Sequence, residues 1–529
     1  MKIRLIGILL WFFFPLCMMA QGDEFQIIKG DCLPSASDGG GSHRASRRLP
    51  AYQKDWDQTK TYHQLVILLS FSDADFTRDN LTEYYGKILN EPGYNEGEGP
   101  GCMADYFRTQ SNGFFNLQFD IYGPYKVSTK ACPEENPTDK TRYYGADALR
   151  EATSLFLEEH PEIDFSQYDW DGDDRIEQVV YIYAGPSGNV KTSNGHIWPN
   201  TSSFSTLTTP DGKKISNYST SAEYWGIKQD LTVVYCGIGT ICHEYSHSLG
   251  LPDIYPVGAA SLNLPYSSVD EWDLMDGGNF VGWGWCPPSY SPLEKMLLGW
   301  LTPIVLTEAT TITDLKPVSE GGTSYQIQHS DNEYLLLENR QWTGWDIGIP
   351  GKGLVIYHVN YDESAWRNNK VNSFNSEDDF RYKLFHADNK DFATWETELG
   401  TKSKYVNPDR MNKVHLSTSS YPYGDNKELT NTSTPAALMK TKNPAGENLL
   451  SKPITNIQMT NEGLVSFDFM GGTTGIEEWK NGRKEERKME GAWYDLSGQR
   501  PVFNSPQKKG VYIFREKDGT TYKVMINAK

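Results

Sequence analysis

The chain has 529 residues, which is enough for more than one domain and for a sizeable buried core. Its formal net charge of −19 argues against nucleic acid as a partner, because a nucleic-acid-binding protein presents a basic surface. Aromatic residues make up 13% of the sequence, which is typical of a globular chain and not of a disordered one.

The amino terminus has the pattern of a secretion signal. Two basic residues precede the apolar run 5–14, and small or apolar residues follow up to Ala20. We therefore expect a signal peptide over residues 1–20 and export to the cell surface or the medium. The run is too short for a membrane span, and no later stretch is apolar enough to cross a bilayer. Lipid attachment at Cys17 is the alternative, although the residues before it are a poor context for lipidation.

Residues 21–59 are interpreted as a short pro-segment or linker. Residues 39–48 combine glycines with basic side chains, which favours proteolytic nicking. The cysteines that remain after signal removal are even in number, which permits disulfides in an exported protein. Cys102 and Cys132 are one candidate pair, and buried free thiols are the alternative. Cys32 is either a thiolate cap of the metal in a latent form or an incidental or disulfide-bonded cysteine.

Residues 60–300 mix short β-rich runs with longer helices. The apolar run 65–73 predicts a strand, and residues 73–77 are expected to line a cleft beyond it. Apolar residues at helical spacing predict a helix over residues 146–157. This periodicity alone does not define the fold of the region.

An acidic loop at residues 169–177 is a candidate calcium site. Acidic side chains stand at positions 1, 3, 5 and 9 of the loop, which matches the opening of an EF-hand. The pattern departs from a true EF-hand, because glycine is at position 4 and Val180 is at position 12. Clustered carboxylates repel one another unless a cation neutralises them, and a solvated acidic turn is the alternative. The predicted calcium ligands are Asp169, Asp171, Asp173 and Glu177.

Residues 243–253 read HEYSHSLGLPD and carry the strongest chemical signal of the chain. On a helix, His243 and His247 lie four residues apart on one face, so two imidazole nitrogens can bind one zinc ion. Glu244 is placed to hold a water molecule at the metal and to take its proton. The apolar run 233–241 before the motif suits a buried helix start.

An extension of this motif supplies a third ligand. Gly250 can adopt a backbone conformation that residues with a Cβ disfavour, so it can end the helix and turn the chain back. Asp253 then reaches the same metal ion, and one position stays open for water, as catalytic zinc requires. A surface helix with two solvated histidines is the alternative.

Residues 271–278 contain Met275 in a predicted tight turn, about twenty to thirty residues beyond the third ligand. In this interpretation Met275 forms an apolar floor below the zinc ligands and does not bind the metal. An ordinary core methionine is the alternative. Asp273 and Asp276 in the same turn are alternative third ligands.

The remaining sequence is rich in predicted strands. Residues 301–471 alternate apolar runs with turn residues and predict a β-rich, sandwich-like companion domain. Whether its first half packs with the catalytic region is open. His358 and His386 lie on strand-like patterns and are interpreted as structural. Residues 472–529 are net basic and predict a small β module of short strands.

These motifs together resemble the immune inhibitor A-like family of secreted bacterial zinc peptidases. The resemblance covers residues from about 60 to 390. It implies an α+β fold in which a zincin- or metzincin-like catalytic domain, with a mixed sheet and an active-site helix, spans residues 60–300. Some relatives carry a glutamate after the motif aspartate, where this chain has Ile254. The tail resembles type IX secretion sorting domains, which makes secretion machinery a possible partner. The segments that carry the family resemblance, besides the zinc motif, are 65–73, 105–113, 291–300, 333–340 and 353–360.

The favoured hypothesis is a secreted zinc endopeptidase that acts on extracellular proteins or peptides. Glu244 would take a proton from the attacking water and pass it to the leaving amine. The candidates for oxyanion stabilisation are His196, Tyr255 and Tyr290. The alternatives are a surface adhesion or binding protein whose peptidase domain is secondary or inactive, and a zinc hydrolase of non-peptide bonds.

Overall fold

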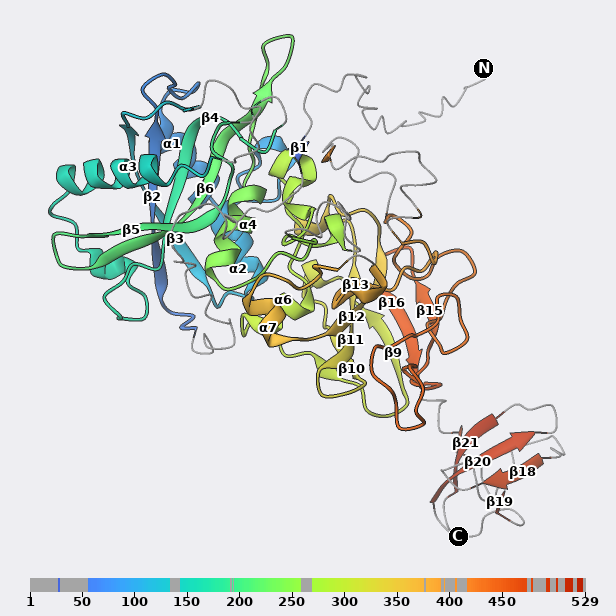
Figure 1. Ribbon diagram of the computed structural model, residues 1–529. Coiled ribbons are helices and arrows are strands. Elements are labelled where there is room, and N and C mark those ends of the chain that lie inside the picture. Colours follow the sequence, from blue (N-terminus) through green and yellow to red (C-terminus); the bar gives the residue numbers. More distant parts are fainter. Residues whose placement is uncertain are drawn as a thin grey trace, which may run out of the picture.

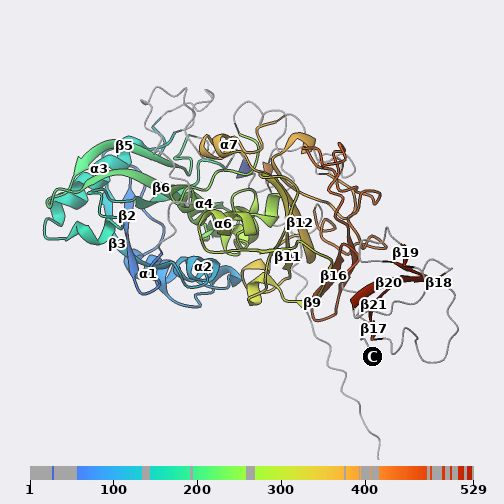
Figure 2. The same ribbon diagram turned by 90° about the horizontal axis from the view of Figure 1, so that it is seen from below.

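The computed structural model describes residues 56–133, 143–190, 195–257, 269–374, 377–391 and 416–472, together with Ser193, Thr394 and several short strands elsewhere. The predicted signal peptide, most of the predicted pro-segment and Cys32 lie outside the described residues. Figure 1 shows the arrangement, and Figure 2 shows the same ribbon from below.

A mixed sheet forms the amino-terminal half of the protein (Figure 1). Its strand order is β3-β2-β4-β6-β5, and the short strand β7 also pairs with β6. The first four strands of this order are parallel, whereas β5 and β7 are antiparallel to β6. The expected strand at 65–73 corresponds to β2, an interior strand between β3 and β4. The bounds are β2 (Thr61–Ser70), β3 (Asn116–Lys126), β4 (Val179–Pro186), β5 (Thr201–Thr208), β6 (Lys214–Ile227) and β7 (Val233–Tyr235).

Helices cover both faces of this sheet. Helix α3 (Ala146–Glu159) packs on one face, where Phe156 contacts the Tyr122 ring of β3. Helices α2 (Met103–Gln110) and α4 (Gly239–Ser248) pack on the opposite face, where Tyr245 contacts Phe119. Tyr122 and Phe119 are three residues apart on one strand, so alternation places their side chains on opposite faces. Helix α1 (Leu81–Asn90) lies beside α2.

Capping residues define where several helices begin. The Cys102 side chain accepts from the Asp105 N–H at the start of α2, and Asp105 accepts from the Cys102 N–H. Ser291 and Glu294 form the same reciprocal pair at α6 (Pro292–Leu297), which also begins with proline. Asp362 caps α7 (Glu363–Arg367). The short 3₁₀ helices are Glu96–Glu98, Phe165–Tyr168, Asp270–Trp272, Gly278–Gly284, Val318–Glu320, Gly344–Asp346 and Glu377–Asp379.

A second sheet has the order β13-β12-β11-β10-β8, and its strands β11 and β12 are buried on both faces. Tyr334 and Leu336 of β11 join the large core of the amino-terminal half. Leu335 and Leu337 point to the other face and join a second core. Strands β11, β12 and β13 therefore pack on the large core of the amino-terminal half. The bounds are β8 (Ile304–Val305), β10 (Tyr325–Gln328), β11 (Glu333–Arg340), β12 (Gly353–Asn360) and β13 (Tyr382–Leu384).

A three-stranded sheet covers the outer face of the second sheet (Figure 1). Its strands are β9 (Thr310–Leu315), β15 (Ile454–Met459) and β16 (Val465–Phe469), in the order β15-β16-β9. Phe467 and Phe469 of β16 lie in the same core as Leu335 of β11. The two sheets thus share one apolar layer.

A buried ion network joins the second sheet to the segment before α6. Arg340 of β11 donates from Nε and Nη2 to the two carboxylate oxygens of Asp346, at 2.9 and 2.6 Å. It also donates to Glu338 at 3.1 Å and to the Ser289 carbonyl at 3.3 Å. The Ser289 N–H donates to Asp346 Oδ1 at 2.8 Å. Buried charged groups therefore join β11 to the segment before α6, in addition to the apolar core that both share.

The carboxy-terminal strands form a separate five-stranded sheet in the order β17-β21-β20-β18-β19. Its strands are β17 (Glu477–Glu478), β18 (Gly491–Tyr494), β19 (Pro501–Val502), β20 (Gly510–Glu516) and β21 (Thr521–Ile526). A further pair joins β1 (Ile27–Ile28) to β14 (Tyr405–Val406). Within the described part of the chain, no helix combines the length and the apolar character that a membrane span requires.

The described cysteines do not form the disulfide that was one candidate. Cys102 is a buried free thiol whose sulfur caps α2, so it is not joined to Cys132. Cys236, Cys242 and Cys286 are also buried free thiols. Burial raises the pKa of the Cys286 thiol to about 11, so it stays protonated at neutral pH.

Candidate metal centre

Helix α4 carries the H-E-x-x-H motif and packs against β5 and β6. The apolar run 233–241 forms strand β7 first, and the helix begins only at Gly239. A Cβ at Gly239 would lie 2.1 Å from the Asn279 carbonyl oxygen, so the helix start needs glycine for close packing. Gly250 has φ 103° and ends the helix as expected.

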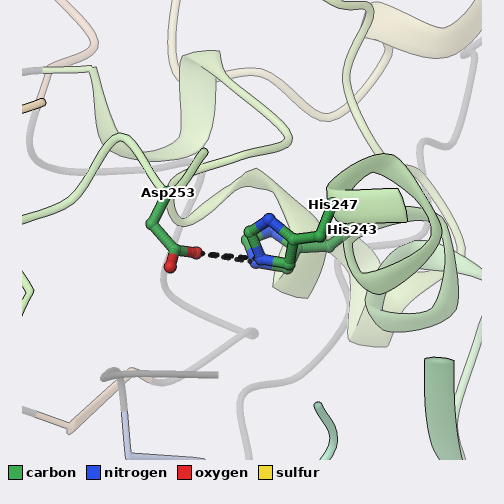
Figure 3. Close-up of side chains that lie close together, drawn as sticks. All are labelled: His243, His247 and Asp253. Carbon is green, nitrogen blue, oxygen red and sulfur yellow. Dashed lines mark hydrogen bonds and ion pairs between the residues drawn. The ribbon is translucent and has the colours of Figure 1, made fainter. Parts of the chain in front are cut away.

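His243, His247 and Asp253 converge on one point (Figure 3). Each histidine Nε2 lies 3.2 Å from Asp253 Oδ1. None of these three side chains, nor that of Glu244, is more than 2% exposed. Two imidazole nitrogens and a carboxylate oxygen at this spacing are a donor set that zinc prefers, so the residues present fit a zinc ion.

Backbone carbonyls fix the two imidazole rings. His243 Nδ1 bonds the Leu274 carbonyl and His247 Nδ1 bonds the Leu251 carbonyl, each at 2.8 Å. A donated proton on Nδ1 leaves the Nε2 lone pair for a metal ion. Leu274 precedes Met275, which is fully buried, and the Met275 carbonyl accepts from the Ile254 N–H at 2.9 Å. The predicted Met-turn is thus bonded to the first histidine and to the residue after Asp253.

The charges of this cluster shift the pKa values of its members. Burial opposes the charged form of His243, but the Asp253 and Glu244 carboxylates outweigh burial and raise the pKa to about 9. Burial likewise opposes ionisation of Asp253, but the two histidines outweigh it and hold the pKa well below its usual range. Without a cation, the Asp253 carboxylate favours a proton on His243, a proposed metal ligand.

Glu244 is held by residues of the sheet that α4 packs against. Thr201 at the start of β5 donates from Oγ1 to the Glu244 carbonyl at 2.6 Å and lies 3.0 Å from its carboxylate Oε2. Ser219 of β6 donates to the same carbonyl at 3.1 Å. These contacts fix the position of the candidate base on the helix.

Asp253 is also contacted from outside the catalytic region. Asn369, just after α7, accepts from the Asp253 N–H at 2.7 Å and donates to Asp253 Oδ2 at 2.5 Å. Asn372 donates to the Ile254 carbonyl at 2.9 Å. Sequence reasoning missed these two residues, because a single asparagine more than a hundred positions away carries no recognisable pattern.

The two alternative acidic ligands lie elsewhere in the turn. Asp273 accepts from the Met275 N–H at 2.8 Å, and Asp276 accepts from the Asp270 N–H at 3.1 Å. Neither belongs to the group that gathers around the histidines. Burial and the nearby Glu294 carboxyl raise the pKa of Asp273 well above its usual range.

The three candidates for oxyanion stabilisation differ in their surroundings. The Tyr255 ring lies nearly parallel to the His243 ring, with centroids 6.4 Å apart. The Tyr290 hydroxyl bonds Ser246 on α4. His196 Nδ1 bonds the Ser193 carbonyl at 3.0 Å, and burial lowers the pKa of its imidazole. Among the contacts just described, the Tyr255 ring pair is the one that includes a candidate metal ligand.

The acidic loop forms a second group of carboxylates. Oxygens of Asp169, Asp171 and Glu177 lie within 4.8 Å of one another, and Asp173 lies outside this group. Lys213 donates to Asp169 Oδ2 at 2.9 Å, so an ammonium already neutralises part of the cluster. Burial, followed by repulsion from Asp171 and Asp169, raises the pKa of Glu177 to about 8.

The mixed sheet, the α4 helix and the converging donor set fit the catalytic domain of a metallopeptidase. Comparison with known families leads to the same class. Residues 51–298 match the family described as immune inhibitor A peptidase M6, catalytic domain. This match covers a little less than half of the chain.

Two curated relatives resemble the same half of the chain. An immune inhibitor A of Bacillus thuringiensis subsp. alesti is 27% identical over 288 residues, which are 46% of this chain and 41% of the relative. A pre-pro-metalloprotease PrtV of Vibrio cholerae serotype O1 is 22% identical over 296 residues, which are 49% of this chain and 31% of the relative. The similarity thus spans less than half the length of either relative.

Proposed function

We propose that this protein is a secreted, zinc-dependent endopeptidase that hydrolyses peptide bonds of extracellular proteins. His243, His247 and Asp253 are the proposed zinc ligands, and Glu244 is the proposed general base. The observation that carries the proposal is the convergence of two Nε2 atoms on Asp253 Oδ1, at 3.2 Å each, beside Glu244 on the same helix.

A zinc ion in this site would supply Lewis-acid polarisation of the scissile carbonyl and would favour ionisation of water near neutral pH. Glu244 would accept a proton from the attacking water and then deliver it to the leaving amine. Thr201 and Ser219 would hold Glu244 in place during both transfers. Tyr255 is our choice for the group that donates to the developing oxyanion, because its ring lies against that of His243.

The substrate class and location are inferred from the domain and the termini. A peptidase M6 catalytic domain supports protein or peptide substrates. The signal-like residues 1–20 support export, and residues 472–529 support engagement of a secretion machinery through a small β module. Zinc as the metal of the α4 site is part of this proposal. Calcium binding by Asp169, Asp171, Asp173 and Glu177 of the acidic loop is also part of it.

The test is the Glu244→Gln variant of the full chain, assayed on casein with bound zinc measured in parallel. General acid–base groups contribute on the order of 10²–10⁴-fold, so we expect a rate loss in that range at unchanged zinc content. Glu151→Gln is the matched control, because Glu151 is a half-buried glutamate of α3 that accepts hydrogen bonds from Ser128, far from α4 in the sequence. Chelator should abolish casein cleavage and zinc should restore it.

Three results would contradict the proposal. A Glu244→Gln variant that cleaves casein within tenfold of the parent would remove Glu244 as the base. A chelator-sensitive enzyme that cleaves esters but no peptide would favour a zinc hydrolase of non-peptide bonds. A metal-loaded protein without any hydrolytic activity would favour the binding or adhesion alternative.

A further inference from the structure

We propose that Asn369 is a positioning residue that orients Asp253 for metal binding. This inference rests on the proposed function, because it takes Asp253 as the third zinc ligand. Asn369 lies outside the matched catalytic region, so the metal centre would be completed by a loop of the β-rich part of the chain.

The side-chain amide of Asn369 matches both polar groups that Asp253 presents to it. The Asp253 N–H donates to Asn369 Oδ1 at 2.7 Å, and Asn369 Nδ2 donates to Asp253 Oδ2 at 2.5 Å. Of the two orientations of the Asn369 amide, only the one with Nδ2 toward the carboxylate satisfies both contacts. The Asp253 N–H needs an acceptor, and the Asp253 carboxylate needs a donor. Both residues are buried, so water does not compete well for these bonds.

This contact leaves the two carboxylate oxygens in different roles. Oδ2 is engaged by Asn369, whereas Oδ1 faces both histidine Nε2 atoms. Rotation of the carboxylate would break the bond to Asn369. The amide therefore presents Oδ1 to the metal position and favours binding through one oxygen. Partners of this kind orient metal ligands and tune their basicity.

The loop that carries Asn369 is built for this position. Asn369 has φ 56°, a left-handed conformation that asparagine adopts more readily than most residues. Three residues later, Asn372 donates to the Ile254 carbonyl at 2.9 Å and to the Tyr382 carbonyl at 2.7 Å. Tyr382 begins β13, so the loop is anchored to the second sheet and to the ligand segment at the same time.

Three variants separate orientation from simple packing. Asn369→Gly removes the amide and tolerates the left-handed backbone. Asn369→Asp keeps an acceptor for the Asp253 N–H but replaces the donor with a second carboxylate. Asn368→Gly is the matched control, because the neighbouring Asn368 is exposed and its amide donates to the carbonyl and hydroxyl of Ser364.

The primary readout is the zinc dissociation constant, measured by competition with a chromogenic chelator. Loss of a group that orients a metal ligand typically costs 10–100-fold in metal affinity, and we expect this loss for both Asn369 variants. We expect Asn368→Gly to match the parent. The visible spectrum of the cobalt-substituted protein should change in the Asn369 variants and not in the control, because the ligand geometry changes.

A double-variant cycle identifies the route of the effect. If Asn369 acts through Asp253, Asn369→Gly should weaken zinc binding in the parent and have no further effect in an Asp253→Ala background. An equal loss in both backgrounds would overturn the proposal, since it would indicate a general effect on folding. Normal zinc affinity in both Asn369 variants, with Asp253→Ala impaired, would also overturn it. Unchanged affinity in Asp253→Ala itself would instead remove the ligand assignment in the proposed function.

Discussion

Replacement of Arg340 by methionine tests how the β-rich sheet is joined to the catalytic region. Arg340 is fully buried and makes a two-pronged ion pair with Asp346, which in turn holds the Ser289 N–H. Methionine fills a similar volume but leaves the Asp346 carboxylate buried without its cation. Burial raises the pKa of Glu338, and the Lys295 ammonium, which remains in the variant, opposes that rise.

The expected loss in the free energy of unfolding is about 3–5 kcal/mol, the range for removing one partner of a buried ion pair. Asp346→Asn in the same chain should recover part of this loss, since asparagine keeps an acceptor for Ser289 without a charge. Arg367→Met is the surface control. Its ion pair with Glu363 is exposed, and such pairs contribute about 1 kcal/mol or less.

Urea unfolding followed by circular dichroism at pH 8 and pH 5.5 measures these differences. Burial raises the pKa of Glu338 and Arg340 opposes that rise, so the folded-state pKa of Glu338 should rise further in Arg340→Met. A raised folded pKa stabilises the folded state at low pH and loses that effect as pH rises. The gap between variant and parent should therefore be smaller at pH 5.5. A gap below about 1 kcal/mol at pH 8, or one that does not change with pH, would refute this reasoning.

Two further predictions concern other charged groups. Burial alone would raise the pKa of Glu333, but bonds from His358, Thr441 and the Lys440 N–H outweigh it and lower the pKa to about 2. Because the folded pKa is depressed, up to about 3 kcal/mol of stability should be present above pH 4.5 and be lost towards pH 2. Acid titration followed by circular dichroism should therefore show a shallower loss of stability for Glu333→Gln than for the parent. For the loop Asp169–Glu177, calcium at many times its dissociation constant should raise the melting temperature, and the combined variant Asp171→Ala and Asp173→Ala should reduce that gain; a melting curve indifferent to calcium in both proteins would leave a solvated acidic turn.

The zinc motif shows what local sequence can predict. His243 and His247 share one face of α4 because of helix periodicity, and Gly250 just after α4 ends the helix because of backbone sterics. Their arrangement therefore follows from spacing alone. The parallel central strands were less accessible, since a run such as Leu65–Leu69 fits either a buried strand or a buried helix segment. Resemblance to a family predicted the mixed sheet, which periodicity alone did not.

Long-range contacts were beyond the sequence for a different reason. Asn369 reaches Asp253 across 116 positions, and its only local peculiarity is a left-handed backbone that sequence does not display. Lys213 beside Asp169 is a similar case, because the ion pair depends on how β6 runs past the loop. Both contacts arise from tertiary packing, and no fixed spacing encodes them.

The sheet β8, β10–β13 has two apolar faces, and this affects how the protein could have been assembled during evolution. The family similarity ends at residue 298, but one core continues through Tyr334, Val355 and Tyr382. Recombination at residue 300 would divide this core, and each product would expose apolar side chains that the other part had covered. Any replacement partner would need matching side chains on both sides of β11 and β12. The catalytic region and its neighbouring sheet are therefore expected to be inherited together, and to change together, as one piece.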